Sequence, residues 1–101
     1  MTRRIVLLVY PGFQVLDAAG PLAAFEAANA FVPNAYLLEL IARDGGLVAS
    51  SGGTRLAATA FSNRAGDDTL IVTGGDGVFA AAECALTVGF VSNSGAALRR
   101  I

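Results

Sequence analysis

The chain opens with a continuous run of apolar residues. Ile5–Val9 contains only β-branched and aliphatic side chains, and it is bounded by Arg3-Arg4 and Pro11-Gly12. Runs of this kind are typical of a strand that is covered on both faces, as in a parallel sheet. The pattern therefore predicts that the first element is an interior strand.

A helical pattern follows between Leu16 and Ala30. Apolar residues recur there at three- and four-residue spacing, in an alanine-rich stretch that favours helix. Asp17 is the predicted N-cap, because its carboxylate can accept hydrogen bonds from the free amides of a first turn. Pro21 favours the first position of the main helix. We therefore expect a short turn at Asp17 that leads into a longer helix, which Val32-Pro33-Asn34 end.

The rest of the chain alternates strand patterns with glycine turns. Predicted strands cover residues 36–42, 47–50, 54–57 and 69–73, and Ser51-Gly52-Gly53 joins the two middle ones. Phe61–Gly66 is a predicted polar connector. Residues 78–98 carry a loose helical stripe, which Asn93-Ser94-Gly95 could break in two. The order strand–helix–strand–hairpin–strand–helix predicts an α/β layer fold with right-handed crossovers.

Composition narrows the class of protein. The 101 residues fit one domain (residues 1–101), and 54% hydrophobic with 15% charged residues argues against disorder. So apolar a chain is expected to need another covering layer. With a net charge of −1 and scattered arginines, we expect no direct nucleic-acid contact. No apolar run is long enough for a membrane helix, and the N-terminus lacks a cleavage pattern, so the predicted location is cytoplasmic.

The single cysteine, Cys84, is the obvious nucleophile candidate. The chain has no histidine to activate it, and one cysteine allows neither an internal disulfide nor a cysteine-based metal site. We expect Cys84 to lie on a helix beside Glu83, whose charge would raise the thiol pKa. A small buried or incidental surface thiol is the favoured interpretation. Neither a cofactor nor a metal is expected.

Two other features follow predicted strands. Asp17 could act as a general acid or base if it is desolvated, or simply cap a helix, and the two roles are compatible. In Thr73–Gly77, glycines could let amides stabilise an oxyanion, although a tight turn is the simpler explanation. Arg43-Asp44 and Asp67-Asp68 look like solvated loop charges. The candidate ligand-binding residues are Tyr10, Gly12, Asp17, Gly74 and Gly75.

These residues also carry a family resemblance. The segments are Arg4–Phe13, Leu16–Leu22, Phe25–Asn29, Asp68–Val72 with Gly74-Gly75, and Arg99-Arg100-Ile101. Together they resemble the N-terminal part of ThiJ/PfpI proteins, a superfamily with a class I glutamine amidotransferase-like fold. Because of Ala27-Ala28-Asn29, the similarity is closest to the ligand-sensing domain of AraC-type transcriptional regulators.

The resemblance implies a flavodoxin-like, doubly wound, mostly parallel sheet, usually in a homodimer. In the family's enzymes a cysteine lies on a strand-to-helix turn, an acidic residue matching Asp17 assists it, and amides matching Gly75 help form the oxyanion hole. In the regulators this pocket is thought to bind a small molecule, and a helix-turn-helix domain follows. The family cysteine would come after Ile101, and Cys84 does not match it. The resemblance therefore implies an N-terminal portion of such a domain.

Three functions stay open at this point. The favoured one is a ligand-sensing domain fragment of an AraC-type regulator, which is not catalytic by itself. The second is the N-terminal part of a cysteine-dependent ThiJ/PfpI hydrolase or isonitrile hydratase-like enzyme, in which Asp17 would be the acid or base. The third is a stand-alone small α/β protein.

Overall fold

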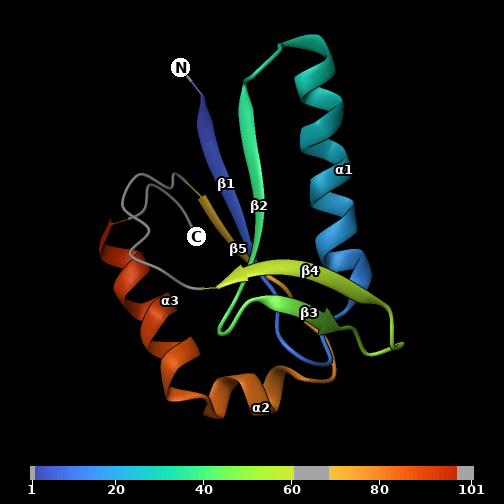
Figure 1. The fold of residues 1–101 in the computed structure, drawn as a ribbon. Coiled ribbons are helices and arrows are strands. Elements are labelled where there is room, and N and C mark those ends of the chain that lie inside the picture. The colour runs from blue at the N-terminus through green and yellow to red at the C-terminus, as the bar shows by residue number, and fades with distance from the viewer. Residues whose placement is uncertain (1, 61–68, 98–101) are drawn as a thin grey trace.

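A five-stranded sheet runs through the centre of the computed structural model, which describes residues 2–60 and 69–97 (Figure 1). Its strands are β1 (Arg3–Leu8), β2 (Tyr36–Ala42), β3 (Gly46–Ala49), β4 (Arg55–Ala60) and β5 (Thr69–Val72). The spatial order is β3-β4-β2-β1-β5. All neighbours pair in parallel except β3 and β4, which form the expected hairpin. The apolar run at the start of the chain is therefore an interior strand, as predicted.

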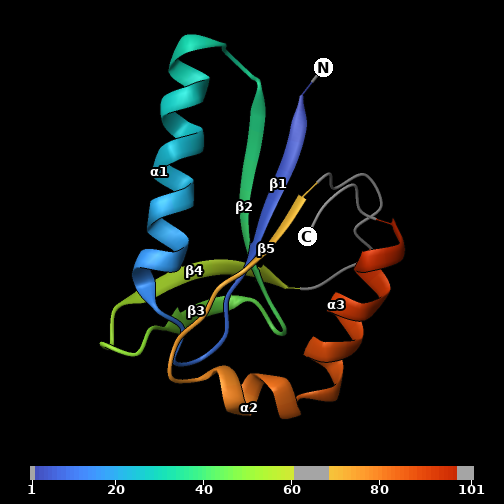
Figure 2. The ribbon, with the colours of Figure 1, turned by 180° about the vertical axis from the view of Figure 1, so that it is seen from behind.

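Helices flank the sheet on both sides, so the doubly wound α/β architecture is confirmed. α1 (Val15–Phe31) and α3 (Ala85–Ala97) lie at opposite sides of the sheet, and α2 (Val78–Glu83) lies beneath its carboxyl end (Figures 1 and 2). Alternate residues of β1 supply two different cores because successive side chains of a strand point to opposite faces. Val6 and Leu8 pack with Phe90 and Val91 of α3, whereas Val9, directly after β1, packs with Ala18 of α1.

The start of α1 differs from the sequence prediction. The helix begins at Val15 with Gln14 as its N-cap, and no side chain caps it. Asp17 is therefore not the N-cap, and Pro21 lies inside one continuous helix instead of starting it. A proline so close to a helix start removes one backbone hydrogen bond, and Gly20 before it has no Cβ to meet the ring. Tertiary packing of Ala18 thus overrides the local signals.

Asn29 fixes the connection from α1 to β2. Its side-chain amide donates to the carbonyl of Tyr36 and accepts from the amide of Tyr36, both at 2.9 Å. The rings of Phe25 and Tyr36 pack edge to face with centroids 4.7 Å apart. Asn29 therefore stabilises the connection between α1 and β2, which explains its presence in this segment.

The C-terminal half contains two helices where the sequence predicts one loose stripe. The chain breaks at Cys84, between α2 and α3, and not at Asn93-Ser94-Gly95, which lie inside α3. The predicted connector Phe61–Gly66, the Asp67-Asp68 pair and Arg99-Arg100-Ile101 lie outside the described residues.

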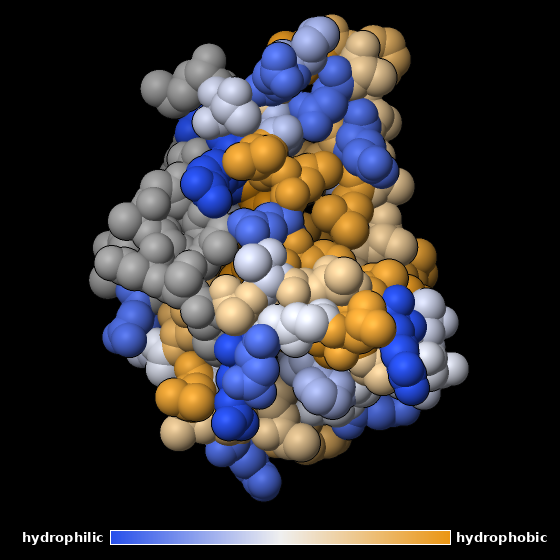
Figure 3. Space-filling model, viewed as in Figure 1, coloured by the Kyte–Doolittle hydropathy of each residue, from blue (hydrophilic) through white to orange (hydrophobic). Residues whose placement is uncertain are grey.

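The outer face of α1 is apolar. Leu16 and Phe31, at its two ends, are 68% and 87% exposed, and the alanines at positions 19, 23, 27 and 30 between them are exposed as well. Figure 3 shows this flank of the molecule as apolar surface beside more polar regions. A helix that is apolar on both its inner and outer faces is typical of one with a second layer against it.

Candidate functional site

The loop after β1 and the turn after β5 are joined by backbone hydrogen bonds. The amide of Gln14 donates to the carbonyl of Gly74 at 2.7 Å, and the amide of Gly77 donates to the carbonyl of Gly12 at 3.0 Å. Both segments follow the carboxyl ends of neighbouring parallel strands, where ligands bind in open α/β sheets. We call this pairing of residues 10–17 with residues 73–77 the loop junction.

Glycine is required where the two segments meet. Gly75 has φ +134°, and a Cβ there would lie 2.5 Å from the amide nitrogen of Gln14 and 2.6 Å from the carbonyl oxygen of Gly12. At Gly12, with φ +83°, a Cβ would lie 2.9 Å from the Cα and the amide nitrogen of Gly77. The glycines therefore allow two backbones to touch, which is the tight-turn explanation of the sequence pattern.

Asp17 holds the junction from the first turn of α1. Its Oδ2 accepts a hydrogen bond from the amide of Gly74 at 2.8 Å, although the residue is exposed to solvent. The carboxylate thus binds the turn after β5 and does not cap its own helix.

Tyr10 connects β1 to β5 from inside the protein. Its hydroxyl donates to the carbonyl of Thr73 at 2.6 Å, and the Thr73 hydroxyl donates to the carbonyl of Leu8 at 2.8 Å. Burial raises the pKa of the Tyr10 hydroxyl above its ordinary value of 10.0, the Asp17 charge adds to the rise, and a hydrogen bond with Thr73 opposes it. Tyr10 is therefore a neutral hydrogen-bond donor over the physiological pH range.

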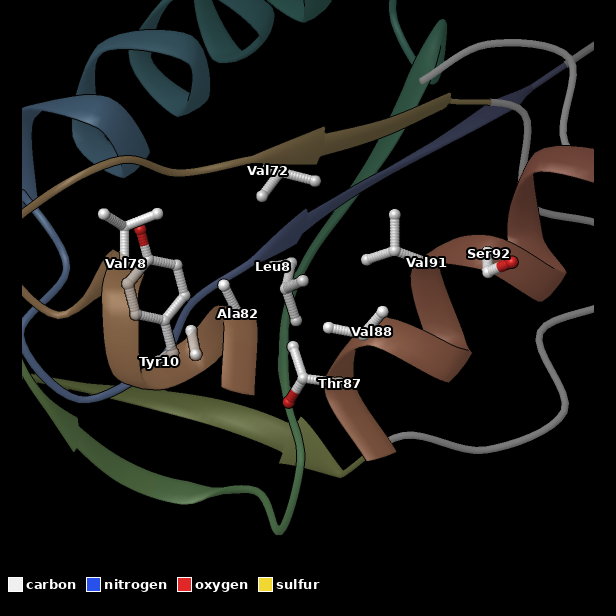
Figure 4. A pocket seen from close by; sticks show the side chains of 10 residues that line it. Leu8, Tyr10, Val72, Val78, Ala82, Thr87, Val88, Val91 and Ser92 are labelled. Carbon is white, nitrogen blue, oxygen red and sulfur yellow. The ribbon is translucent and has the colours of Figure 1, made fainter. Parts of the chain in front are cut away.

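An apolar cavity of about 320 Å³ lies between β1, β5 and the two C-terminal helices. Leu8, Val72, Val88 and Val91 converge on it, and the Tyr10 ring forms another part of its wall (Figure 4). The Thr87 hydroxyl points away from the valines in this view. The cavity could hold a small apolar group.

A second cavity of about 530 Å³ lies on the other side of Tyr10, Ala81 and Thr87, which line both. Arg43, from the carboxyl end of β2, and Cys84 also line it. The guanidinium Nη1 of Arg43 lies 3.8 Å from the Cys84 sulfur. This second cavity is polar on one side only, and we call it the Arg43 cavity.

The environment of Cys84 differs from the prediction. The hydroxyl and the backbone amide of Thr87 lower the pKa of the thiol, with smaller contributions from the Leu86 amide and from Arg43, although partial desolvation opposes them. The predicted rise next to Glu83 is wrong, because α2 ends at Glu83 and Cys84 precedes the first turn of α3. Its sulfur thus meets free helix amides.

All five candidate ligand-binding residues lie in the loop junction: Tyr10, Gly12, Asp17, Gly74 and Gly75. Tyr10 contacts the segment after β5 through its hydrogen bond to Thr73. Sequence reasoning overlooked Thr87 and treated Arg43 as a solvated loop charge. A charged residue directly after a buried strand was the available signal for Arg43. Thr87 gave no signal, because its role depends on where α3 begins.

Among residues 2–60 and 69–97, no three carboxylates or thiols gather in a group that could hold a metal ion. None of the helices in these ranges combines the length and apolar character needed to cross a membrane.

The geometry defines a flavodoxin-like α/β protein whose candidate site lies at the carboxyl ends of its parallel strands. A crystal structure of a ThiJ/PfpI family protein from Pseudomonas syringae superimposes with a TM-score of 0.83 and 30% identity, over 98% of this chain and 40% of that protein. The chain thus shares the fold of the ThiJ/PfpI superfamily, and the resemblance drawn from the sequence is confirmed.

Two further proteins are similar to this chain. An AraC family transcriptional regulator from Pseudomonas putida superimposes with a TM-score of 0.68 and 24% identity over 72% of this chain and 47% of the regulator. An uncharacterized protein from the cpoL 5' region of Streptomyces lividans is 42% identical over 74 residues, which cover 72% of this chain and 52% of that protein. The chain therefore spans about half the length of these relatives or less. No family model matches the sequence.

Proposed function

We propose that the chain is a ligand-sensing domain of the kind found in AraC-type transcriptional regulators, and that it is not catalytic by itself. One observation carries the proposal. The Asp17 carboxylate is bound by the Gly74 amide, whereas the single thiol of the chain lies beside Arg43 and Thr87. The acidic residue and the thiol are therefore engaged with different partners, and these two groups form no nucleophile–acid pair within residues 2–60 and 69–97.

The likeness to the Pseudomonas putida regulator supports the same proposal at the level of the fold. The Ala27-Ala28-Asn29 segment supports the assignment to a regulator less strongly than the sequence alone indicated. Asn29 is needed to hold Tyr36 at the start of β2, and any protein with this connection could use it.

The alternative is the N-terminal part of a cysteine-dependent ThiJ/PfpI hydrolase or isonitrile hydratase-like enzyme. The likeness to the Pseudomonas syringae protein favours it, together with the position of Asp17 next to the Gly74-Gly75 amides. In that case Asp17 would serve as acid or base, and the amide of Gly75 would help to stabilise an oxyanion.

Ligand screening of the purified chain tests the proposal. We expect some members of a panel of small amines, amino acids and carboxylic acids to raise the thermal unfolding midpoint, because a ligand that binds only the folded state stabilises it. Asp17→Asn should abolish the effect for ligands at the loop junction. Glu26→Gln removes an exposed carboxylate elsewhere on α1 and is the matched control.

Turnover assays test whether the chain is catalytic by itself. We expect neither isonitrile hydration nor amide hydrolysis. Turnover that disappears in Cys84→Ser would overturn the proposal and identify Cys84, which does not match the family cysteine, as a nucleophile. The nucleotide sequence after codon 101 adds an independent test, since a helix-turn-helix in the same frame supports the regulator.

We also propose that the chain forms a homodimer through the outer face of α1. This face is apolar from Leu16 to Phe31, and such surface is costly to leave in water. Sedimentation equilibrium should show a dimer that Phe31→Glu weakens. A purely monomeric chain at micromolar concentration would contradict this arrangement.

A further inference from the structure

The Arg43 cavity shares Tyr10 and Pro11 with the loop junction, but its polar groups differ from those of the junction. It opens at the carboxyl ends of β1 and β2, between the β3–β4 hairpin and the two C-terminal helices. Its volume of about 530 Å³ falls within the range of small-molecule sites. Neither Asp17 nor Gly74 lines it.

Most of its wall is apolar. Val9 and Val48 are buried behind it, and Leu47, Ala80 and Ala81 complete the surface. Leu47 is 67% exposed, which is a high value for a leucine at the edge of a hollow. The wall can therefore accept the hydrocarbon body of a ligand, and covering Leu47 would add to the binding free energy.

One corner of the cavity carries the polar groups. Arg43 Nη1 lies 3.8 Å from the Cys84 sulfur, and Arg43 Nε lies 3.6 Å from the Asp44 carboxylate. The Asp44 side chain is 81% exposed, whereas that of Arg43 is 52% exposed. The guanidinium thus spans from solvent to the cavity, with one edge toward Asp44 and the other toward the interior.

This corner stabilises negative charge. Two lining residues, Thr87 and Arg43, donate to the Cys84 sulfur and, together with the Leu86 amide, lower the pKa of the thiol. A group that favours a thiolate at this place would favour another anion beside it for the same electrostatic reason. The reactivity of the Cys84 thiol therefore depends on the electrostatic environment of this corner and can be used to detect an anion bound there.

We propose that the Arg43 cavity binds a small organic monocarboxylate, with its carboxylate against Arg43 and its apolar body against Val48 and Leu47. A single guanidinium matches a carboxylate in charge and planar geometry. A phosphate would bring more charge than one arginine balances, and the Asp44 carboxylate at the rim would repel it. A bare inorganic anion has no apolar part that could pack against the mostly apolar wall.

A pair of probes isolates the charge. 2-Naphthoate and 2-naphthamide share one ring system and differ in the anionic group, and both can be titrated calorimetrically into the purified chain. We expect 2-naphthoate to bind about tenfold more tightly or better, since a hydrogen bond to a charged group contributes more than one to a neutral group. Bound 2-naphthoate should also slow the alkylation of Cys84 by iodoacetamide.

Four variants locate the site. Arg43→Gln should remove the preference for 2-naphthoate, and Asp44→Asn should strengthen it because the guanidinium loses its internal partner. Arg55→Gln, an exposed arginine on β4 outside the lining, is the matched control. Ala80→Phe fills the cavity from an exposed position of α2 and should weaken both probes.

The results decide the proposal either way. Equal affinity for the two probes, an unchanged preference in Arg43→Gln, or unaltered alkylation of Cys84 at saturating 2-naphthoate would each overturn it. The variants are at half-exposed or exposed positions, and a circular dichroism melt of each verifies that it is folded. Glu26 does not line this cavity, so Glu26→Gln should leave 2-naphthoate binding unchanged. The readout is the Arg43-dependent preference for 2-naphthoate, so this test can fail independently of the proposed sensing role of the loop junction.

Discussion

Replacing Gly75 by alanine should strongly destabilise the fold. The added Cβ would lie 2.5 Å from the Gln14 amide nitrogen and 2.6 Å from the Gly12 carbonyl oxygen. Both obstacles are backbone atoms, which cannot rotate away as a side chain can. The loop after β1 and the turn after β5 would have to separate, and the hydrogen bond from Gln14 to Gly74 would lengthen.

The size of the effect follows from two costs. A non-glycine residue at φ +134° carries backbone strain of about 1–3 kcal/mol. Forcing a methyl group into a filled space costs about 1–3 kcal/mol more. We therefore expect Gly75→Ala to lower the free energy of unfolding by about 3 kcal/mol, a large share of the roughly 5–15 kcal/mol of a typical domain.

Urea unfolding followed by circular dichroism measures this loss, and Gly53→Ala is the matched control. Gly53 also has a positive φ, +89°, but a Cβ there meets nothing within 4 Å. Its replacement should cost only the backbone strain, about 1 kcal/mol. Equal losses of stability in the two variants would refute the close backbone contact between the loop after β1 and the turn after β5.

Three further variants test individual positions. Tyr10→Phe leaves the buried Thr73 carbonyl without its donor and should cost about 1–3 kcal/mol in urea unfolding. The pKa of Tyr10 is raised in the folded state, so the contribution of its hydroxyl to the free energy of unfolding is complete below pH 10.0. This contribution is lost as the pH rises through the pKa of the folded state. The wild type should therefore lose stability relative to Tyr10→Phe in an alkaline titration. Asn29→Ala removes two hydrogen bonds to Tyr36 and should lower the thermal midpoint, whereas an unchanged midpoint would refute their importance. Gly89→Ala, inside α3 with open space around it, should stabilise the chain by about 0.5–1 kcal/mol, and a loss of stability would show that the helix is wrongly placed.

Much of the sheet was predictable from local patterns. The apolar run Ile5–Val9 and the alternation over residues 36–42 identified two parallel strands, and the glycine loop at residues 51–53 identified the hairpin. These signals are reliable because burial on one or both faces dictates the residue type at each position. The glycines at 12 and 75 were also among the candidate residues, and both lie where two backbones approach closely.

The errors arose where tertiary contacts override local preference. Aspartate is a residue type favoured at the N-cap of a helix. The carboxylate of Asp17 instead accepts a hydrogen bond from the amide of Gly74, 57 residues away in the sequence. Cys84 follows a helical alanine stretch, and nothing local marks the break between α2 and α3. Its sulfur therefore lies beside Arg43, a contact across 41 residues that no pattern in the sequence encodes.

A two-dimensional ¹H–¹⁵N NMR titration of the labelled chain with the ligands that raise its thermal midpoint tests the central claim most directly. Saturable shifts of the Gly74 and Gly75 amides, with the ligand recovered unchanged from the tube, are the predicted result. Consumption of an amide or isonitrile ligand during the titration, abolished by Cys84→Ser, would contradict a domain that senses its ligand without transforming it.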